Sequence, residues 1–229
     1  TAVAFVVIDA HAVPDFLIYG EGIEAAVQAL EPRLDDAVAA SCGVVLGSNT
    51  CLGEHERTIT QHARTLALAQ SKPVIVDVNL RLGRWHDEME ARDVVQSLCR
   101  DAFLVKASQD EARLLTGEED PAAAAAAICA TLDVRLAVVT LGADGALMRG
   151  EASADAPGVP AEVVDTTGAG DAVTGVLAAA LAQSGFDPRE AARALGIAVG
   201  VASRSTESYG AAALHSTPIE FPLAAAGTA

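Results

Sequence analysis

The chain has 229 residues, of which 15 are Lys or Arg and 31 are Asp or Glu, so its formal net charge is −16. A protein that binds nucleic acid or an anionic membrane needs clustered cationic side chains, and the sequence contains no basic run, so we expect neither partner. Hydrophobic residues make up 51% and aromatic residues only 3%, which predicts a folded core of Ala, Val, Leu and Ile. No apolar stretch reaches the roughly 20 residues of a membrane span, and the first residues lack a basic signal-peptide start, so we expect a cytoplasmic protein.

The first 20 residues differ in pattern from the rest. Val3–Asp9 and Phe16–Tyr19 flank a turn-like segment, which predicts a β-hairpin beside the main domain. Beyond them, short Val/Ile-rich runs alternate with longer Ala/Leu-rich helical patterns, as is typical of βα units around a mostly parallel sheet. The predicted strands are Gly43–Gly47, Pro73–Asp77, Ala102–Val105 and Arg135–Thr140. The predicted helices between them are Glu54–Gln70, Asp87–Arg100, Gln109–Leu115 and Pro121–Leu132.

The last third of the chain continues this α/β organisation. Gly145–Arg149 and Glu162–Asp165 are short strand candidates separated by Gly, Pro and Ser residues. Two apolar helical stretches follow, Ala169–Gln183 and Pro188–Ala202. At this length a core needs no disulfide or metal to hold it.

The cysteines and histidines give no metal-site pattern. The four cysteines have no CxxC pair or zinc-ligand spacing, and each lies in or beside an apolar stretch, so we expect small buried hydrophobes at Cys42, Cys51, Cys99 and Cys129. His55 and His62 can share one helix face, and because that face has no cysteine or acid between them, we expect a solvated helix there.

The segment with the most chemical content is Val163–Gly175, with the sequence VVDTTGAGDAVTG. The small residues Gly168, Ala169 and Gly170 let backbone N–H groups face an anion, and the helix start adds its positive dipole end. This pattern predicts a phosphate or oxyanion cradle. Asp171 in the first helical turn has two interpretations, either an ordinary helix-start acid or a general base for phosphoryl transfer.

The string D-T-T-G-A-G-D-A-x-x-G resembles the C-terminal signature of the ribokinase-like, or PfkB-type, carbohydrate kinases. It is neither a Walker A loop nor a dinucleotide fingerprint. The resemblance implies a three-layer α/β/α kinase core over residues 21–229 and a small β lid, of which residues 1–20 are a part. It also implies that Asp171 accepts the proton of a sugar hydroxyl while the Gly168, Ala169 and Gly170 amides stabilise the transferring γ-phosphoryl group.

The segment Asp77-Val78-Asn79-Leu80-Arg81, with Trp85 after it, is similar to the D-x-N-x-R…W segment of fructokinase-like and 2-keto-3-deoxygluconate-kinase-like members. It follows a predicted strand, where open parallel sheets bind ligands. The resemblance implies substrate or phosphate contacts for Asn79 and Arg81, whereas the residues alone also allow a polar turn with Arg81 paired to an acid. Trp85 and Tyr19 could contact a sugar or simply pack.

The segment from Lys106 to Glu111 is similar to the N-x-x-E segment of the family, with Ser108 at the Asn position. The resemblance implies that Lys106, Ser108 and Glu111 lie at the nucleotide and that Glu111 organises Mg²⁺ through water. Glu111 is also placed as a capping-box residue reaching back to Ser108, and both roles can coexist.

Two further stretches resemble nucleotide-binding parts of the family. Residues 140–145, TLGADG, resemble the T-L-G-x-x-G turn that lies under the nucleotide in the family. The resemblance implies that Thr140, Gly142 and Gly145 bind the nucleotide. Gly210 and Ala211 match the end of a small-residue stretch that holds adenine and, with Asp165 and Thr167, a monovalent cation. Residues 205–209 depart from the common T-R-x-G-A form.

The resemblance runs from the hairpin to about Pro218 but begins inside the family pattern. We therefore expect a βα portion with further sugar-binding acids to precede this chain in the complete protein. The implied activity is ATP-dependent phosphorylation of a hydroxyl on a small sugar or sugar acid, with ATP, Mg²⁺ and optionally K⁺. The alternatives are a non-catalytic nucleotide- or sugar-binding relative and a nucleoside kinase of the same superfamily. Because such hairpins form a dimer interface in some relatives, a homodimer is a further expectation.

Overall fold

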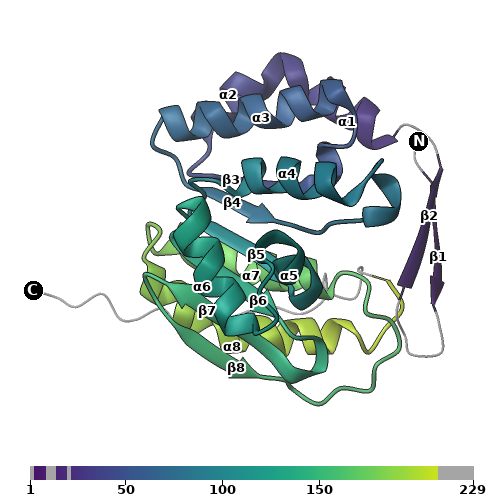
Figure 1. The fold of residues 1–229 in the computed structure, drawn as a ribbon, viewed down its shortest axis with the longest axis vertical. Coiled ribbons are helices and arrows are strands. Elements are labelled where there is room, and N and C mark those ends of the chain that lie inside the picture. Colours follow the sequence, from purple (N-terminus) through teal and green to yellow (C-terminus); the bar gives the residue numbers. More distant parts are fainter. Residues whose placement is uncertain (1–2, 9–13, 20–21, 211–229) are drawn as a thin grey trace, which may run out of the picture.

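The computed structural model describes residues 3–8, 14–19 and 22–210 (Figure 1). Its centre is a six-stranded sheet in which each strand neighbours the next one along the chain. The strands are β3 (Val44–Gly47), β4 (Val74–Asp77), β5 (Leu104–Ser108), β6 (Leu136–Thr140), β7 (Gly145–Gly150) and β8 (Ala154–Pro157). β3 to β6 are parallel, and β7 and β8 continue the sheet antiparallel.

Helices cover both faces of this sheet, which confirms the predicted three-layer α/β/α arrangement (Figure 1). Right-handed crossovers between successive parallel strands place their helices on one face. These helices are α3 (Glu54–Ala69), α4 (Glu88–Cys99), α5 (Gln109–Thr116) and α6 (Pro121–Leu132), with α1 (Gly22–Leu30) and α2 (Leu34–Ala40) packed against α3. The other face is covered by α7 (Ala169–Gln183) and α8 (Pro188–Ser205), which contact each other closely.

The core consists of two aliphatic layers, one on each side of the sheet. Consecutive residues of a strand point to opposite faces, so Leu104 lies in the layer beneath α7 and α8 while Val105 lies in the layer beneath α3 to α6. Both side chains are fully buried. The predicted Ala/Val/Leu/Ile core is therefore confirmed. Among the described residues, no helix is long and apolar enough to cross a membrane.

The first strands form the predicted hairpin, separate from the main sheet (Figure 1). β1 (Val3–Ile8) pairs antiparallel with β2 (Pro14–Tyr19), with Val3 opposite Tyr19. The second strand begins two residues earlier than predicted. The side chain of Tyr19 and residue Ala211, both considered above as ligand contacts, lie outside the described residues.

The strand predicted at Glu162–Asp165 is wrong. This segment is an irregular loop whose Val164 and Asp165 amides donate to the Thr206 carbonyl at 2.8 and 3.0 Å. The last strand is instead β8, which pairs with β7 through a short connection. The Val164 and Asp165 amides are therefore bonded to the end of α8 and not to a neighbouring strand. Helices α1 and α2 were not predicted.

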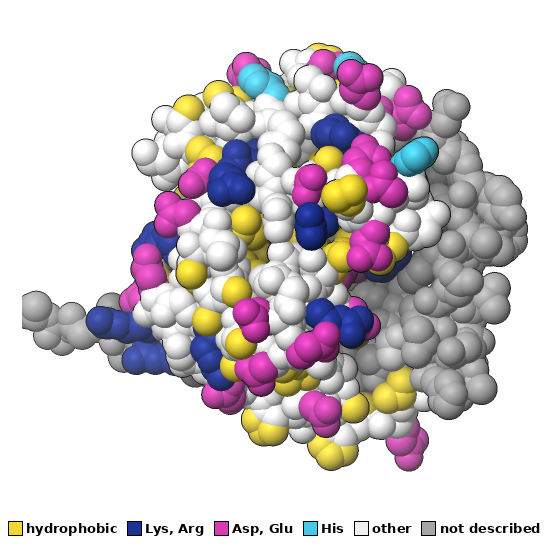
Figure 2. Space-filling model, in the orientation of Figure 1, with side chains coloured by type: hydrophobic (Ala, Val, Ile, Leu, Met, Phe, Trp, Pro, Cys, Tyr) yellow, Lys and Arg dark blue, Asp and Glu magenta, His cyan; other side chains and the backbone are white. Residues whose placement is uncertain are grey.

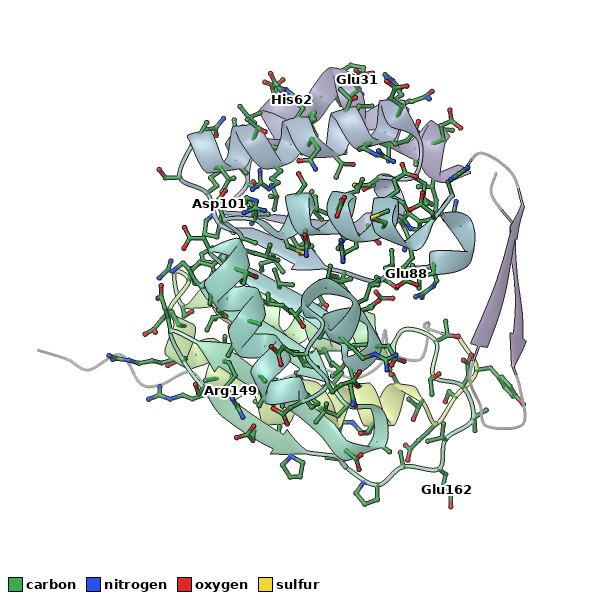
Figure 3. All side chains as sticks on the ribbon, in the orientation of Figure 1. Glu31, His62, Glu88, Asp101, Arg149 and Glu162 are labelled. Atoms are coloured by element: carbon green, nitrogen blue, oxygen red, sulfur yellow. The ribbon has the colours of Figure 1, made fainter. Side chains whose placement is uncertain are left out.

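The buried-cysteine prediction holds for two residues and fails for one. Cys51 and Cys99 are buried and Cys129 is half-buried, but Cys42 is exposed because it lies in the bend between α2 and β3. The histidines of α3 are half-exposed, and each contacts an acid: His55 lies 3.3 Å from Glu31 and His62 lies 2.8 Å from Asp35. Figure 3 labels one member of each pair, Glu31 and His62.

Candidate active site

A polar cavity of about 250 Å³ lies where the carboxyl ends of β4, β5 and β6 face the start of α7. Parallel strands end at the same edge of the sheet, which is why residues far apart in the sequence meet there. The structure thus brings most of the predicted site residues together. The lining residues are Asn79, Arg81, Lys106, Ser108, Glu111, Thr140, Thr166, Thr167, Gly168, Gly170 and Asp171.

Beneath this cavity lies a buried ionic centre. The Lys106 ammonium is 3.1 Å from Asp77 Oδ1, and the Thr174 hydroxyl donates to Asp77 Oδ2 at 2.6 Å. All three residues are buried, and Asp77 and Lys106 are register partners on β4 and β5. Lys106 also fills the space beside Gly170, since a Cβ placed there would lie 2.6 Å from its Nζ. A side chain at position 170 would therefore collide with the ammonium.

Asp171 stands at the mouth of the cavity, in the first turn of α7. Partial burial and the nearby Asp77 carboxylate raise the pKa of Asp171, while Lys106 and Arg81 act in the opposite direction. A carboxylate with a raised pKa is a better proton acceptor than an ordinary aspartate, which is the property that a general base requires.

The amides at the start of α7 are those expected to face an anion. Helix geometry leaves the first-turn N–H groups without intrahelical acceptors. The Ala169 amide donates to the Thr166 carbonyl at 3.2 Å, so Gly168 and Gly170 are the stronger candidates for anion contacts. These local donors matter because the surface is dominated by acids, which Figure 2 shows scattered over one face with fewer cations between them.

Glu111 ties two loops of the site together. Its Oε1 accepts from the Leu80 amide and its Oε2 from the Ser108 amide, both at 2.7 Å. The Ser108 hydroxyl accepts in turn from the Glu111 amide, which confirms the predicted capping box. Glu111 therefore holds the loop that carries Asn79 and Arg81. Both carboxylate oxygens keep lone pairs that can accept from water.

The backbone of Asn79 is held in an uncommon conformation, with φ of 39°. Its carbonyl accepts from the Asn49 amide side chain at 3.1 Å. Trp85, farther along the same loop, packs against the core, and the Arg57 guanidinium lies 5.8 Å from its ring centre. Trp85 is therefore a packing residue in this structure.

A second cavity of about 600 Å³ adjoins the first through Thr140, Thr166 and Gly170. It includes the predicted residues Gly142, Gly145 and Ala169. Most of the lining comes from residues to which the sequence pattern gave no individual role, although some lie in its motif segments; they are Ala143, Gly158, Val159, Pro160, Ala161, Val163, Val173, Val199, Ala202, Ser203 and Thr206. Val159 and Val163 are 45% and 50% exposed, so they add apolar surface to this cavity.

Gly210 lies apart from the lining of both cavities and instead anchors Asp165. The Gly210 and Thr167 amides each donate to one oxygen of the Asp165 carboxylate at 2.8 Å. Burial would raise the pKa of Asp165, but the hydrogen bonds from Thr167 and Gly210 outweigh it and lower that pKa. The buried hydroxyl oxygen of Thr167 has no partner in hydrogen-bonding geometry among the described residues.

Sequence reasoning missed two members of the site, Asp77 as a functional group and Thr174. The sequence did contain a signal for Asp77. It is an acid at the end of one predicted strand, and Lys106 follows the end of the next predicted strand, so the two side chains can lie side by side in a parallel sheet. Thr174 had no signal, since its partner lies 97 residues away.

The fold and the site together define a carbohydrate-kinase-like α/β protein. The family profile described as pfkB family carbohydrate kinase matches residues 1–218, and the chain belongs to this family. The Arabidopsis thaliana protein named Probable fructokinase-7 is 32% identical over 182 residues, which cover 77% of this chain and 53% of that protein. A fructokinase of Klebsiella pneumoniae is 35% identical over 128 residues, covering 55% of this chain and 41% of the relative.

The solved structures agree with this assignment. The crystal structure of fructokinase from Vibrio cholerae O395, bound to fructose, ADP and calcium ion, matches with a TM-score of 0.68 and 30% identity. The match covers 74% of this chain and 56% of that one. Aminoimidazole riboside kinase from Salmonella enterica, with aminoimidazole riboside and an ATP analogue, matches at a TM-score of 0.68 and 27% identity, over 74% of this chain and 58% of that one. The chain spans about half the length of the curated relatives it matches.

Proposed function

We propose that this chain forms the catalytic part of an ATP-dependent kinase that phosphorylates a hydroxyl of a small sugar of the fructose type. The observation that carries the proposal is the position of Asp171. Asp171 lines one cavity together with the glycines at the start of α7 and with Asn79 and Arg81. The fructose-bound structure of a relative that is 30% identical supports the substrate class.

In this proposal each residue has a separate task. Asn79 and Arg81 orient the sugar so that one hydroxyl faces Asp171. Asp171 accepts the proton of that hydroxyl as its oxygen attacks the γ-phosphorus of ATP; the bond from this phosphorus to the β,γ-bridging oxygen breaks, and ADP leaves. The Gly168 and Gly170 amides, with the Lys106 ammonium, stabilise the negative charge on the transferring group. Phosphoryl transfer of this kind depends on positioning and electrostatics, so no covalent intermediate with the protein is needed.

The nucleotide fits the two adjoining cavities. The polar cavity suits its phosphates, because Gly170 lacks the Cβ that would fill it and Lys106 lies beside that space. The apolar cavity beyond Thr140, with Gly142 and Gly145 in its lining, suits the base.

The ions implied by the family also fit residues of this chain. Mg²⁺, when bound, would supply positive charge that neutralises the nucleotide phosphates, and Glu111 would hold it through water because both carboxylate oxygens already accept backbone amides. A monovalent cation such as K⁺ would be held by the Asp165–Thr167 turn, where the buried Thr167 hydroxyl lacks a partner among the described residues.

The test measures ADP release by the complete protein over a panel of sugars, sugar acids and nucleosides. We expect turnover of a ketose and an approximately 10²- to 10⁴-fold lower kcat for Asp171→Asn, the range that a general base contributes. Asp155→Asn is the matched control, because Asp155 is exposed and pairs with Arg149 on β7, away from the cavity (Figure 3). A native rate for Asp171→Asn would show that Asp171 is not the base.

The nucleoside arm of the panel addresses a second candidate. The similarity to aminoimidazole riboside kinase favours a ribosyl substrate as the alternative. Turnover of ribosides without turnover of ketoses would reassign the substrate. Nucleotide-induced stabilisation without any turnover would indicate the non-catalytic relative.

A further inference from the structure

The buried contact between β4 and α7 is the feature of the site that the proposed reaction leaves unexplained. Asp77 uses one carboxylate oxygen for Lys106 and the other for the Thr174 hydroxyl, at 3.1 and 2.6 Å. The side chains of Asp77 and Lys106 are only 10% and 7% exposed. With a separate donor on each oxygen, the carboxylate is fixed in rotation as well as in position.

Stability alone gives a weak reason for such a group. Desolvating two charges can cost as much as their attraction returns, and well-packed apolar residues often serve equally well. The location suggests another reason, because the ammonium lies beside the glycine at the start of α7, 2.6 Å from the place of a Gly170 Cβ. Lys106 also contributes to the lining of the polar cavity.

Resting on the proposed function, we propose that Thr174 is a positioning residue: through Asp77, it fixes the Lys106 ammonium against the glycines of α7, where phosphoryl oxygens bind. Thr174 and Gly170 are four residues apart on the same helix, so they lie on one face one turn apart. The hydroxyl therefore connects the helix that carries the anion-binding amides to the strand pair that carries the cation. The cation and the amides are held as one unit.

Removing the hydroxyl has a directional consequence. In Thr174→Val, Asp77 Oδ2 loses its donor while the helix keeps a side chain of nearly the same shape. The carboxylate is then free to rotate and take the Lys106 ammonium with both oxygens, which draws the ammonium away from Gly170. The phosphate contacts weaken, whereas the apolar cavity for the base is unchanged.

The experiment compares Thr174→Val, Thr174→Ser and a control, Thr60→Val, with the native protein. Thr60 is also buried, and its hydroxyl donates to Thr50 at 2.9 and 3.1 Å, but it lies on α3 outside both cavities. Calorimetry measures the Kd of a non-hydrolysable ATP analogue and of adenosine. The ADP-release assay measures kcat and the KM for sugar.

For Thr174→Val we expect kcat to fall about 10- to 100-fold, as a misplacement near 1 Å can cause, with the sugar KM changed less than about threefold. The Kd of the ATP analogue should rise about tenfold, a loss typical of one charged contact, while that of adenosine stays within about twofold. Thr174→Ser should restore both values, and Thr60→Val should change neither.

Two results would overturn the inference: native kcat and analogue affinity in Thr174→Val, or equal losses in Thr60→Val. The binding measurements keep the two proposals separate. If the native protein binds the analogue but phosphorylates nothing on the panel, the proposed reaction fails. The role of Thr174 is then decided by binding alone, that is, by whether Thr174→Val raises the Kd of the ATP analogue more than the Kd of adenosine.

Discussion

The turn at residues 140–145 offers a sharp test, because its two glycines resemble each other in sequence and differ in surroundings. Gly142 has φ of 60° and its absent Cβ would meet nothing within 4 Å. Gly145 has φ of 102° and ψ of −132°, and a Cβ there would fall on the Ala156 carbonyl and lie 2.6 Å from the Gly158 amide nitrogen. Gly142→Ala therefore tests backbone strain alone, and Gly145→Ala tests backbone strain together with a steric collision.

The magnitudes follow from these contacts. For Gly142→Ala, left-handed strain of about 1–2 kcal/mol is partly offset by the smaller entropy of the unfolded chain, about 0.4–1 kcal/mol, so a loss on the order of 1 kcal/mol is expected. For Gly145→Ala, strain reaches about 1–3 kcal/mol, and the backbone between β8 and the loop must also move. We expect a total loss of about 3–5 kcal/mol, within the range of severe single substitutions.

Urea unfolding followed by circular dichroism gives the free energy of unfolding of each variant, and calorimetry gives ADP binding. Gly145→Ala should also weaken ADP binding, since the displaced Gly158 lines the cavity for the base. Gly142→Ala should change binding less. Equal losses of stability in the two variants, or a loss below about 1 kcal/mol for Gly145→Ala, would refute this reasoning.

Three further predictions concern charge and reactivity. Burial and Asp77 raise the pKa of Asp171, so kcat/KM should begin to fall on acidification at a higher pH than for an ordinary aspartate base. Asp77→Asn should move this fall in the pH profile to lower pH. A movement to higher pH would contradict the assignment of Asp171 as the base. Lys106→Met should cost about 3–5 kcal/mol of unfolding free energy, because the buried Asp77 carboxylate loses its counter-charge. Glu151→Gln, in an exposed pair, should cost at most about 1 kcal/mol, and similar losses of the two variants in urea unfolding would disprove the difference. Iodoacetamide at pH 8 should label the exposed Cys42 first, as measured by mass spectrometry. Burial raises the pKa of Cys51 to about 11 and also raises the pKa of Cys99, so early labelling of either buried thiol would count against this packing.

Several parts of the fold could be predicted because their causes are local. An aspartate followed by a proline is a residue order that favours a helix start, and Asp120 accepts from the Ala123 amide while Pro121 opens α6. The β4 and β6 predictions succeeded because strands buried on both faces are continuous aliphatic runs. The strand predicted at Ala102–Val105 was misplaced, since β5 runs from Leu104 to Ser108 and Lys106 interrupts its aliphatic run. Glu162–Asp165 failed because a short apolar pair has the same local preference in a loop and in a strand, and only the neighbouring chain decides between them.

The candidate site divides in the same way. The GAGD segment indicated an anion-binding helix start by its residues alone, because the property belongs to the backbone of that segment. The pattern also supplied Asn79, Arg81 and Glu111 as polar groups at strand ends. It gave no indication that Glu111 would hold the Leu80 amide, since that contact joins two separate loops.

The sequence by itself determined the alternation of strands and helices, the aliphatic core and the polar strand ends, because these depend on periodicity and on single residue types. The tertiary structure alone decided which charged and polar side chains contact one another. Asp77, Lys106 and Thr174 come from three elements, and no local rule links them. Their contact exists because the parallel sheet brings two strand ends side by side and α7 crosses behind them, which places a carboxylate, an ammonium and a hydroxyl in one buried space.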